Sequence, residues 1–70
     1  MDKVKVYYNN ESDTMDIWFG NTEDEVTCEE AGEGIILKKD KSGKTIGIEK
    51  LYVSKTVGID RPLPVELVVA

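Results

Sequence analysis

The segment from Gly34 to Val53 constrains the fold most, because it contains two apolar strand patterns joined by a complete turn signal. The turn signal is Asp40 to Gly43: the aspartate can accept hydrogen bonds from the backbone downstream, and the glycine can adopt the left-handed conformation. Antiparallel pairing around this loop places apolar side chains on one face, with Ile35 opposite Ile48, Leu37 opposite Ile46 and Lys39 opposite Lys44. The segment therefore predicts a β-hairpin with one apolar face.

Gly47 lies inside the second strand of this hairpin, where the same register places it opposite Ile36. A glycine within a strand usually marks a bulge or a place where another group packs directly on the backbone. We expect a bulky side chain to cover Gly47, and we interpret the glycine as a packing requirement rather than as a ligand contact.

Two segments before the hairpin alternate apolar and polar residues. Lys3 to Tyr8 and Thr14 to Phe19 each place every second side chain inward, as half-buried strands do. A polar loop joins them into a second predicted hairpin, with Lys5 facing Asp16 across the ladder. The glutamate-rich residues 25–31 have low strand propensity, so we expect an edge strand or a short strand there.

After Glu49 the alternation ends, and the pattern predicts a short helical segment near residues 50–57 that Gly58 would end. Residues 58–70 form a tail that we expect to pair as an extra strand or to dock on a partner. The chain is thus predicted to be a single mainly β (α+β) domain over residues 1–70, an antiparallel meander of four to five strands. Its predicted core contains Val4, Val6, Tyr8, Met15, Ile17, Phe19, Val26, Ile35, Leu37, Ile46, Ile48 and Leu51.

A chain of 70 residues has a small core and needs another source of stability. Its single cysteine and its lack of histidine argue against disulfides and against zinc, haem or iron–sulfur sites. Oligomerisation is the source that remains, although a well-packed core of this length can also be sufficient. We therefore expect a protein partner or a homodimer, formed through the apolar tail or an exposed sheet edge.

Charge and hydropathy also limit the function. The 14 acidic and 9 basic residues give a net charge of −5, which disfavours general binding to nucleic acid or to an anionic membrane. No apolar run is long enough to span a membrane, and the N-terminal residues lack the apolar core of a signal peptide. We expect a cytoplasmic protein that does not associate with membranes.

No residue pattern predicts a catalytic site, a cofactor or a metal site, so we expect no enzyme activity. Gly43 to Thr45 matches the end of a phosphate-binding loop, but the rest of that motif is absent and a strand is predicted to follow. Ser54 and Lys55 are adjacent, so their side chains point in different directions, and no third group is evident to orient them. Carboxylates such as Asp13 and Asp16 are typical of a solvated face.

The candidate partner surface combines aromatic residues with the lysines near the hairpin tip: Tyr7, Trp18, Lys38, Lys39, Lys41 and Lys44. Because lysines neutralise phosphates and aromatic rings stack on bases, the tip over residues 38–44 is also an alternative site for weak nucleic-acid or ligand binding. The acidic remainder of the chain would repel a nucleic acid, which disfavours that alternative.

A set of residues spread over both predicted hairpins carries a family resemblance: Tyr8, Asp13, Met15 to Phe19, Gly34 to Leu37, Asp40, Gly43, Ile46 to Glu49, Leu51, Ser54 and Lys55. This order resembles the small prokaryotic family catalogued as domain of unknown function 2283, over residues 3–57. Asn10 stands where many relatives have proline, and the tail after Gly58 is particular to this chain. The resemblance implies a small β-rich protein with no assigned activity and no catalytic residues.

These observations favour a non-enzymatic protein-interaction module. In some genomes the members of the resembling family accompany small toxin-like genes. The resemblance therefore implies a specific form of the hypothesis, in which an acidic antitoxin neutralises a small basic toxin by complementary charge.

Overall fold

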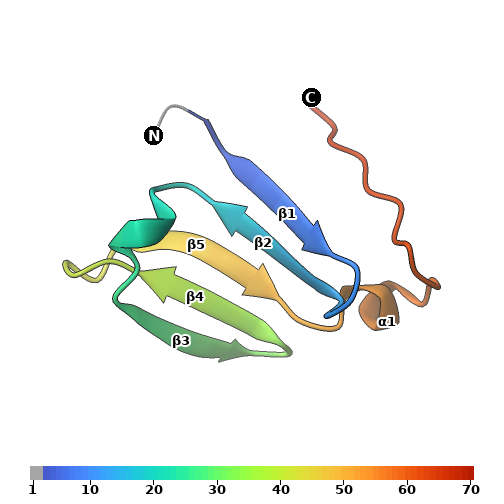
Figure 1. Ribbon diagram of the computed structural model, residues 1–70, viewed down its shortest axis with the longest axis horizontal. Coiled ribbons are helices and arrows are strands. Elements are labelled where there is room, and N and C mark those ends of the chain that lie inside the picture. Colours follow the sequence, from blue (N-terminus) through green and yellow to red (C-terminus); the bar gives the residue numbers. More distant parts are fainter. Residues whose placement is uncertain (1–2) are drawn as a thin grey trace.

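The computed structural model describes residues 3–70 and contains one five-stranded antiparallel sheet with a short α-helix and a 3-10 turn (Figure 1). The elements are β1 Lys5–Asn9, β2 Thr14–Trp18, η1 Thr22–Asp24, β3 Thr27–Gly32, β4 Ile35–Lys39, β5 Thr45–Lys50 and α1 Val53–Val57. The predicted mainly β fold class, the number of strands and the short helix are confirmed.

The strands lie in the order β1-β2-β5-β4-β3, so the sheet departs from a meander, in which consecutive strands are neighbours. β2 pairs with β5 rather than with β3, and the connection through η1 carries the chain across to the far edge (Figure 1). The β5 sequence is apolar enough for a central position, whereas every residue of β3 is exposed. A polar strand is stable at an edge, as predicted for this segment.

The β4–β5 hairpin has the predicted turn chemistry but a different register. The Asp40 carboxylate accepts hydrogen bonds from the backbone N–H groups of Ser42 and Lys44, and Gly43 has a φ of 85°. The loop extends to Lys44, whose carbonyl accepts the Asp40 N–H, so Leu37 pairs with Ile48 instead of Ile46. From Ile35 to Lys38 this shift is two positions, so the paired side chains stay on their predicted faces. A bulge at Ile46 then brings Lys39 opposite Thr45 rather than Lys44.

The β1–β2 hairpin is shifted in the same way. Lys5 lies opposite Trp18, so the predicted pairing of Lys5 with Asp16 is wrong, and Asp16 lies opposite Tyr7. The turn extends to Asp13, which adopts a left-handed conformation with a φ of 57°. A longer loop moves the first paired residues outward, and an even shift again preserves the faces.

The helix α1 lies beyond one end of the sheet and ends as predicted at Gly58, which has a φ of 75° and donates its N–H to the carbonyl of Ser54 (Figure 1). Residues 59–70 then form neither a strand nor a helix. Figure 1 shows this tail turning back on the β1 side of the sheet. Its docking on a partner stays a prediction.

The sheet is one layer thick, and this determines where the core lies. The buried apolar residues are Trp18, Ile46 and Val53, with 8%, 6% and 9% of their surfaces exposed. Among the predicted core residues Val6 is 50% exposed, because no second layer within residues 3–70 packs over β1, and Val26 is 59% exposed in the segment before β3. The predicted core is therefore wrong as a buried set, although those of its residues that are paired across strands share one face.

Candidate functional site

Apolar side chains from four strands are aligned on one face of the sheet, which we call the apolar face. Residues that pair directly across strands project from the same face. A continuous row of such pairs crosses β1, β2, β5 and β4, and it consists of Val6, Ile17, Ile48 and Leu37. The neighbouring row contains Tyr8, Met15, Lys50 and Ile35. Ile17, Ile48, Leu37, Met15 and Ile35 are half-buried, and Val6 is exposed.

The charged groups on the apolar face lie at its margin and have partners. The Lys39 ammonium donates to the Glu29 carboxylate, and both the hydrogen bond and the charge of Lys39 lower the pKa of Glu29. The Lys50 ammonium donates to the carbonyls of Glu33 and Leu51, at 2.9 Å each. The middle of the face therefore offers apolar surface without an unpaired charge.

We call the opposite face of the sheet the Trp18 face, because the Trp18 ring packs on Gly47 there. Trp18 pairs directly with Gly47, and a β-carbon added to that glycine would lie 2.7 Å from Trp18 Cε3. The predicted bulky cover of Gly47 is thus confirmed, and Trp18 supplies it. Because Trp18 is only 8% exposed, its ring is committed to the protein's own backbone rather than offered to a partner.

On the Trp18 face, charged residues from four parts of the chain lie close together. Lys38 Nζ lies 3.5 Å from Glu25 Oε2 and 3.4 Å from Glu49 Oε1. Burial by itself would lower the pKa of Lys38, but these two carboxylates raise it. Asp16 pairs with Glu49 across β2 and β5, and its Oδ1 is buried without a hydrogen-bond partner. Burial, followed by the charge of Glu49, raises the pKa of Asp16.

The structure divides the predicted partner surface. Strand alternation places Tyr7, Trp18 and Lys38 on the Trp18 face, whereas Lys39 projects from the apolar face toward Glu29. The other two lysines, Lys41 and Lys44, lie in the exposed hairpin loop. The six residues therefore do not form one continuous surface.

A buried cluster of hydrogen bonds around Asp13 joins the β1–β2 turn to α1, and we call it the Asp13 clasp. Asp13 is 5% exposed, so its assignment to a solvated face is wrong. Its carboxylate accepts the Ser54 N–H at 3.0 and 3.2 Å, the Ser54 hydroxyl at 2.8 Å and the Tyr8 hydroxyl at 2.7 Å. Its backbone carbonyl accepts the Val53 N–H. The clasp thereby holds the start of α1, which follows β5, against the β1–β2 turn.

The electrostatics of the clasp suit a structural role. Burial would raise the pKa of Asp13, but the hydrogen bonds from Ser54 and Tyr8, together with the charge of Arg61, lower it to about 2. A carboxylate with so low a pKa is a poor base at neutral pH, which disfavours a role for Asp13 in activating the Ser54 hydroxyl. The sequence signal for this clasp was the shared presence of Tyr8, Asp13 and Ser54 in the family pattern.

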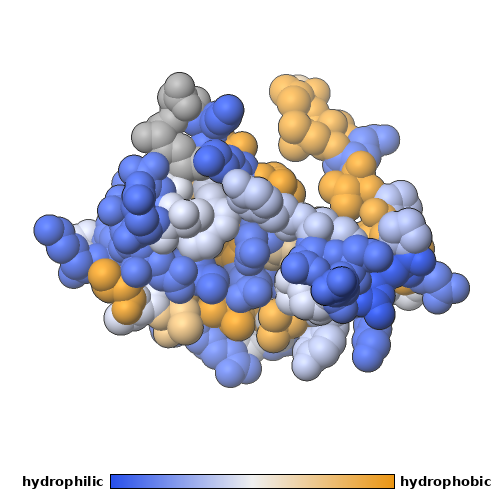
Figure 2. Space-filling model, viewed as in Figure 1, coloured by the Kyte–Doolittle hydropathy of each residue, from blue (hydrophilic) through white to orange (hydrophobic). Residues whose placement is uncertain are grey.

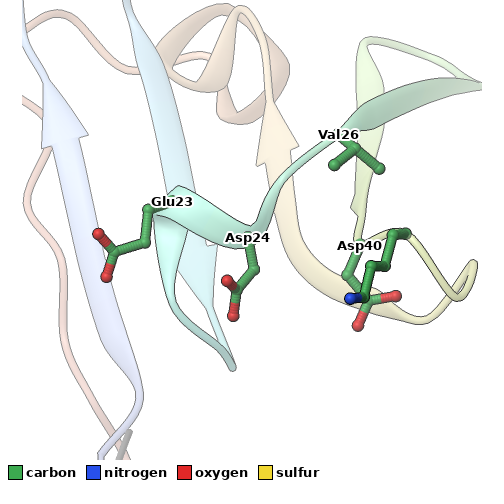
Figure 3. Close-up of a pocket in the computed structure, with 5 residues that line it drawn as sticks. Glu23, Asp24, Val26 and Asp40 are labelled. Carbon is green, nitrogen blue, oxygen red and sulfur yellow. The ribbon is translucent and has the colours of Figure 1, made fainter.

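A shallow hollow of about 300 Å³ lies between η1 and the hairpin loop, lined by Glu23, Asp24, Val26, Asp40 and Lys41. Figure 3 shows Glu23 and Asp24 spread along η1 while Asp40 lies across the hollow, so the carboxylates do not converge on one point. Among residues 3–70, no group of three or more His, Cys, Asp or Glu side chains is placed to hold a metal ion.

The family model described as "Protein of unknown function (DUF2283)" matches residues 5–54. The chain belongs to this family. The matched segment contains the sheet and ends at Ser54, the residue that closes the clasp on Asp13. No curated protein and no solved structure matches the chain significantly. In the part of the chain that the structure describes, no helix is both long enough and apolar enough to cross a membrane.

Proposed function

We propose that this DUF2283 protein is a non-enzymatic protein-interaction module and that its apolar face is the binding surface. The observation that carries the proposal is the aligned row of Val6, Ile17, Ile48 and Leu37, over which no helix or second sheet packs among the described residues 3–70. A contiguous apolar patch on a small protein is typical of a surface that binds another protein.

The energetics of the face support the same proposal. Burial of apolar surface contributes about 25 cal/mol per Å², and a standard interface buries about 800 Å² on each partner. The apolar face has no unpaired charge at its centre that would have to lose its hydration on binding. A partner that covers the face would therefore gain apolar burial without an uncompensated electrostatic cost.

The test uses a matched pair of cysteines on opposite faces of β1. Val6 is 50% exposed and Tyr7 is 52% exposed, so Val6→Cys and Tyr7→Cys should react equally with a maleimide if both faces are free. Both variants are made with Cys28→Ser, because Cys28 is exposed and would react as well. Labelling is measured for the purified protein over a range of concentrations and in an extract of its native cells. Protection of Val6→Cys alone is expected. Equal labelling of the two cysteines under every condition would contradict the proposal.

A second candidate function is the binding of a small basic protein, as an antitoxin binds a toxin. It is favoured by the net charge of −5 and by the Trp18 face, where Asp16, Glu25 and Glu49 surround a single lysine and Asp16 Oδ1 has no partner. The test is co-expression with the product of the neighbouring gene, followed by co-purification at low and high salt. Asp16→Asn should weaken a complex of this kind, and a complex indifferent to both salt and Asp16→Asn would argue against it.

Nucleic-acid binding through the hairpin tip stays a weaker alternative. Lys38 and Lys39 are already paired with carboxylates, which leaves Lys41 and Lys44 as the exposed cations of the loop. Salt-sensitive binding of an oligonucleotide that is lost on changing Lys41 and Lys44 to glutamine would favour this alternative.

A further inference from the structure

We infer that the partner on the apolar face is a second copy of this chain, so that two sheets pack face to face as a symmetric β-sandwich. The inference rests on the proposed function, in which the apolar face is the binding surface, and it identifies what that surface binds. Three observations support it: the exposed area, the distribution of charge between the two faces, and the geometry of the apolar row.

The exposed area is larger than that of a compact chain of this mass. A compact chain of 7.8 kDa exposes about 4,400 Å² by the usual scaling of surface with mass. This chain exposes 5341 Å². The excess of roughly 900 Å² is shared between the open apolar face, where Val6 is 50% exposed, and the apolar tail, where Leu67 and Val69 are 85% and 87% exposed (Figure 2). A standard interface buries about 800 Å² on each partner, so the chain exposes enough surface for one.

The distribution of charge permits a second copy despite the net charge of −5. By strand alternation, Asp16, Glu49 and Glu30 project from the Trp18 face. On the apolar face the paired strand positions contain one carboxylate, Glu29, which lies on the edge strand β3 and is paired with Lys39. Face-to-face packing therefore keeps most of the negative charge on the outer surfaces, where water screens it.

The geometry of the face suits packing on itself. Ile17 and Ile48 lie at the middle of the apolar row, with Val6 and Leu37 on either side. A two-fold axis through the middle pair would bring β2 and β5 of one copy over the same strands of the other. Sheets that pack in this way lie about 10 Å apart, with their side chains interdigitated. Such an interface closes after two copies.

The test compares variants that differ in the face they alter. Val6→Glu and Leu37→Lys place a charge on the apolar face, and Tyr7→Glu and Ile36→Lys place the same charges at neighbouring positions on the Trp18 face. The two glutamate variants make the net charge of the protein more negative, and the two lysine variants make it less negative. If both Val6→Glu and Leu37→Lys weaken the dimer, the cause is therefore the position of the new charge and not the overall repulsion between two acidic chains. Circular dichroism checks that each variant is folded, and sedimentation equilibrium over a range of concentrations gives its dimer dissociation constant.

We expect a wild-type dimer whose dissociation constant rises about tenfold or more in Val6→Glu and Leu37→Lys, and changes little in Tyr7→Glu and Ile36→Lys. A wild-type monomer at high micromolar concentration would overturn the inference, as would equal effects of both pairs. A dimer broken by Leu67→Glu but not by Val6→Glu would place the interface on the tail and overturn it too. If the wild type is monomeric while Val6→Cys is protected in the cell extract, the proposed function survives and the self-association fails.

Discussion

The end of the sheet at the Asp13 clasp and the end at the hairpin tip are held by different interactions. At the clasp end, buried hydrogen bonds connect Asp13 to Ser54, 41 residues away in the sequence. At the tip end, Trp18 lies on the bare backbone of Gly47. Asp40 also organises a turn there, but its hydrogen bonds reach only as far as Lys44.

This difference shows how a one-layer sheet fixes its two ends. A buried hydrogen-bond cluster depends on every member, because losing one leaves buried donors or acceptors without partners. The packing of the Trp18 ring on the Gly47 backbone depends instead on close fit, and an added side-chain atom at Gly47 would disrupt it. The hydrogen bonds of the Asp40 turn are exposed, so water can replace any that are lost, and the turn depends less on each of its members.

The largest expected effect tests the packing at the tip end. In Gly47→Val, a β-carbon 2.7 Å from Trp18 Cε3 must displace the indole ring, which should destabilise the protein by about 3 kcal/mol. Urea unfolding followed by circular dichroism measures the change. In a Trp18→Ala background the ring is gone, so Gly47→Val should then cost much less. An equal cost in both backgrounds would show that Gly47 is required for a reason other than Trp18.

The next largest effect tests the clasp end. Asp13→Asn replaces one acceptor oxygen by an NH₂ group and removes the charge that stabilises the donated hydrogen bonds. Its urea midpoint should fall by less than that of Gly47→Val but by more than that of Ser54→Ala, which keeps the backbone N–H donor. If Ser54→Ala is the more harmful change, the hydroxyl rather than the carboxylate is the centre of the clasp.

The clasp also predicts the response to acid. Because the pKa of Asp13 is about 2 when folded and near 3.8 ordinarily, its contribution to stability is present above pH 3.8 and is lost as the pH falls toward 2. Asp13→Asn should therefore flatten the decline of stability in this range. The matched control is Asp40→Asn, because hydrogen bonds from Ser42 and Lys44 also lower the pKa of Asp40, whose carboxylate lies in the hairpin turn rather than in a buried cluster. An unchanged acid response in Asp13→Asn would contradict the assignment.

The local features of both ends could be predicted from the sequence. Alternation in Lys5–Asn9 and Thr14–Trp18 depends on neighbouring residues alone, and it gave the strands and their faces. Asp40 and Gly43 identified the tip turn because turn chemistry is local. A cover for Gly47 could be expected for the same reason, since a strand glycine leaves space above it.

The features that depend on distant residues could not be predicted. The pairing of β2 with β5 and the two-position shifts are set by how strands separated in sequence compete for the centre of the sheet. The burial of Asp13 depends on Ser54, and neither residue has a local signal for the other. The predicted core was also wrong because the sheet forms a single layer: alternation identifies an apolar face but not what covers that face.

A smaller effect concerns two glycines, one at each end of the sheet. Gly43 in the tip has a φ of 85° and Gly58 after α1 has a φ of 75°, so both occupy the left-handed region that disfavours a β-carbon. The two backbone conformations are thus alike. Gly43→Val and Gly58→Val should each destabilise by about 1–2 kcal/mol in urea unfolding. A clearly larger cost at Gly58 would mean that α1 adds stability beyond its clasp.

The smallest expected effect separates the lysines of the tip end by their contacts. Lys41 and Lys44 are exposed loop residues, so changing both to glutamine should alter the free energy of unfolding by less than about 0.5 kcal/mol. Lys38 is partly buried between Glu25 and Glu49, and its replacement by glutamine leaves two carboxylates facing Asp16 without a cation. Lys38→Gln should therefore cost more, up to about 1 kcal/mol, and less at high salt. Both variants are measured in the same urea series at low and high salt. If the loop pair costs as much as Lys38→Gln, the loop lysines pack against the sheet, and the tip is no longer the locally organised turn that distinguishes it from the Asp13 clasp.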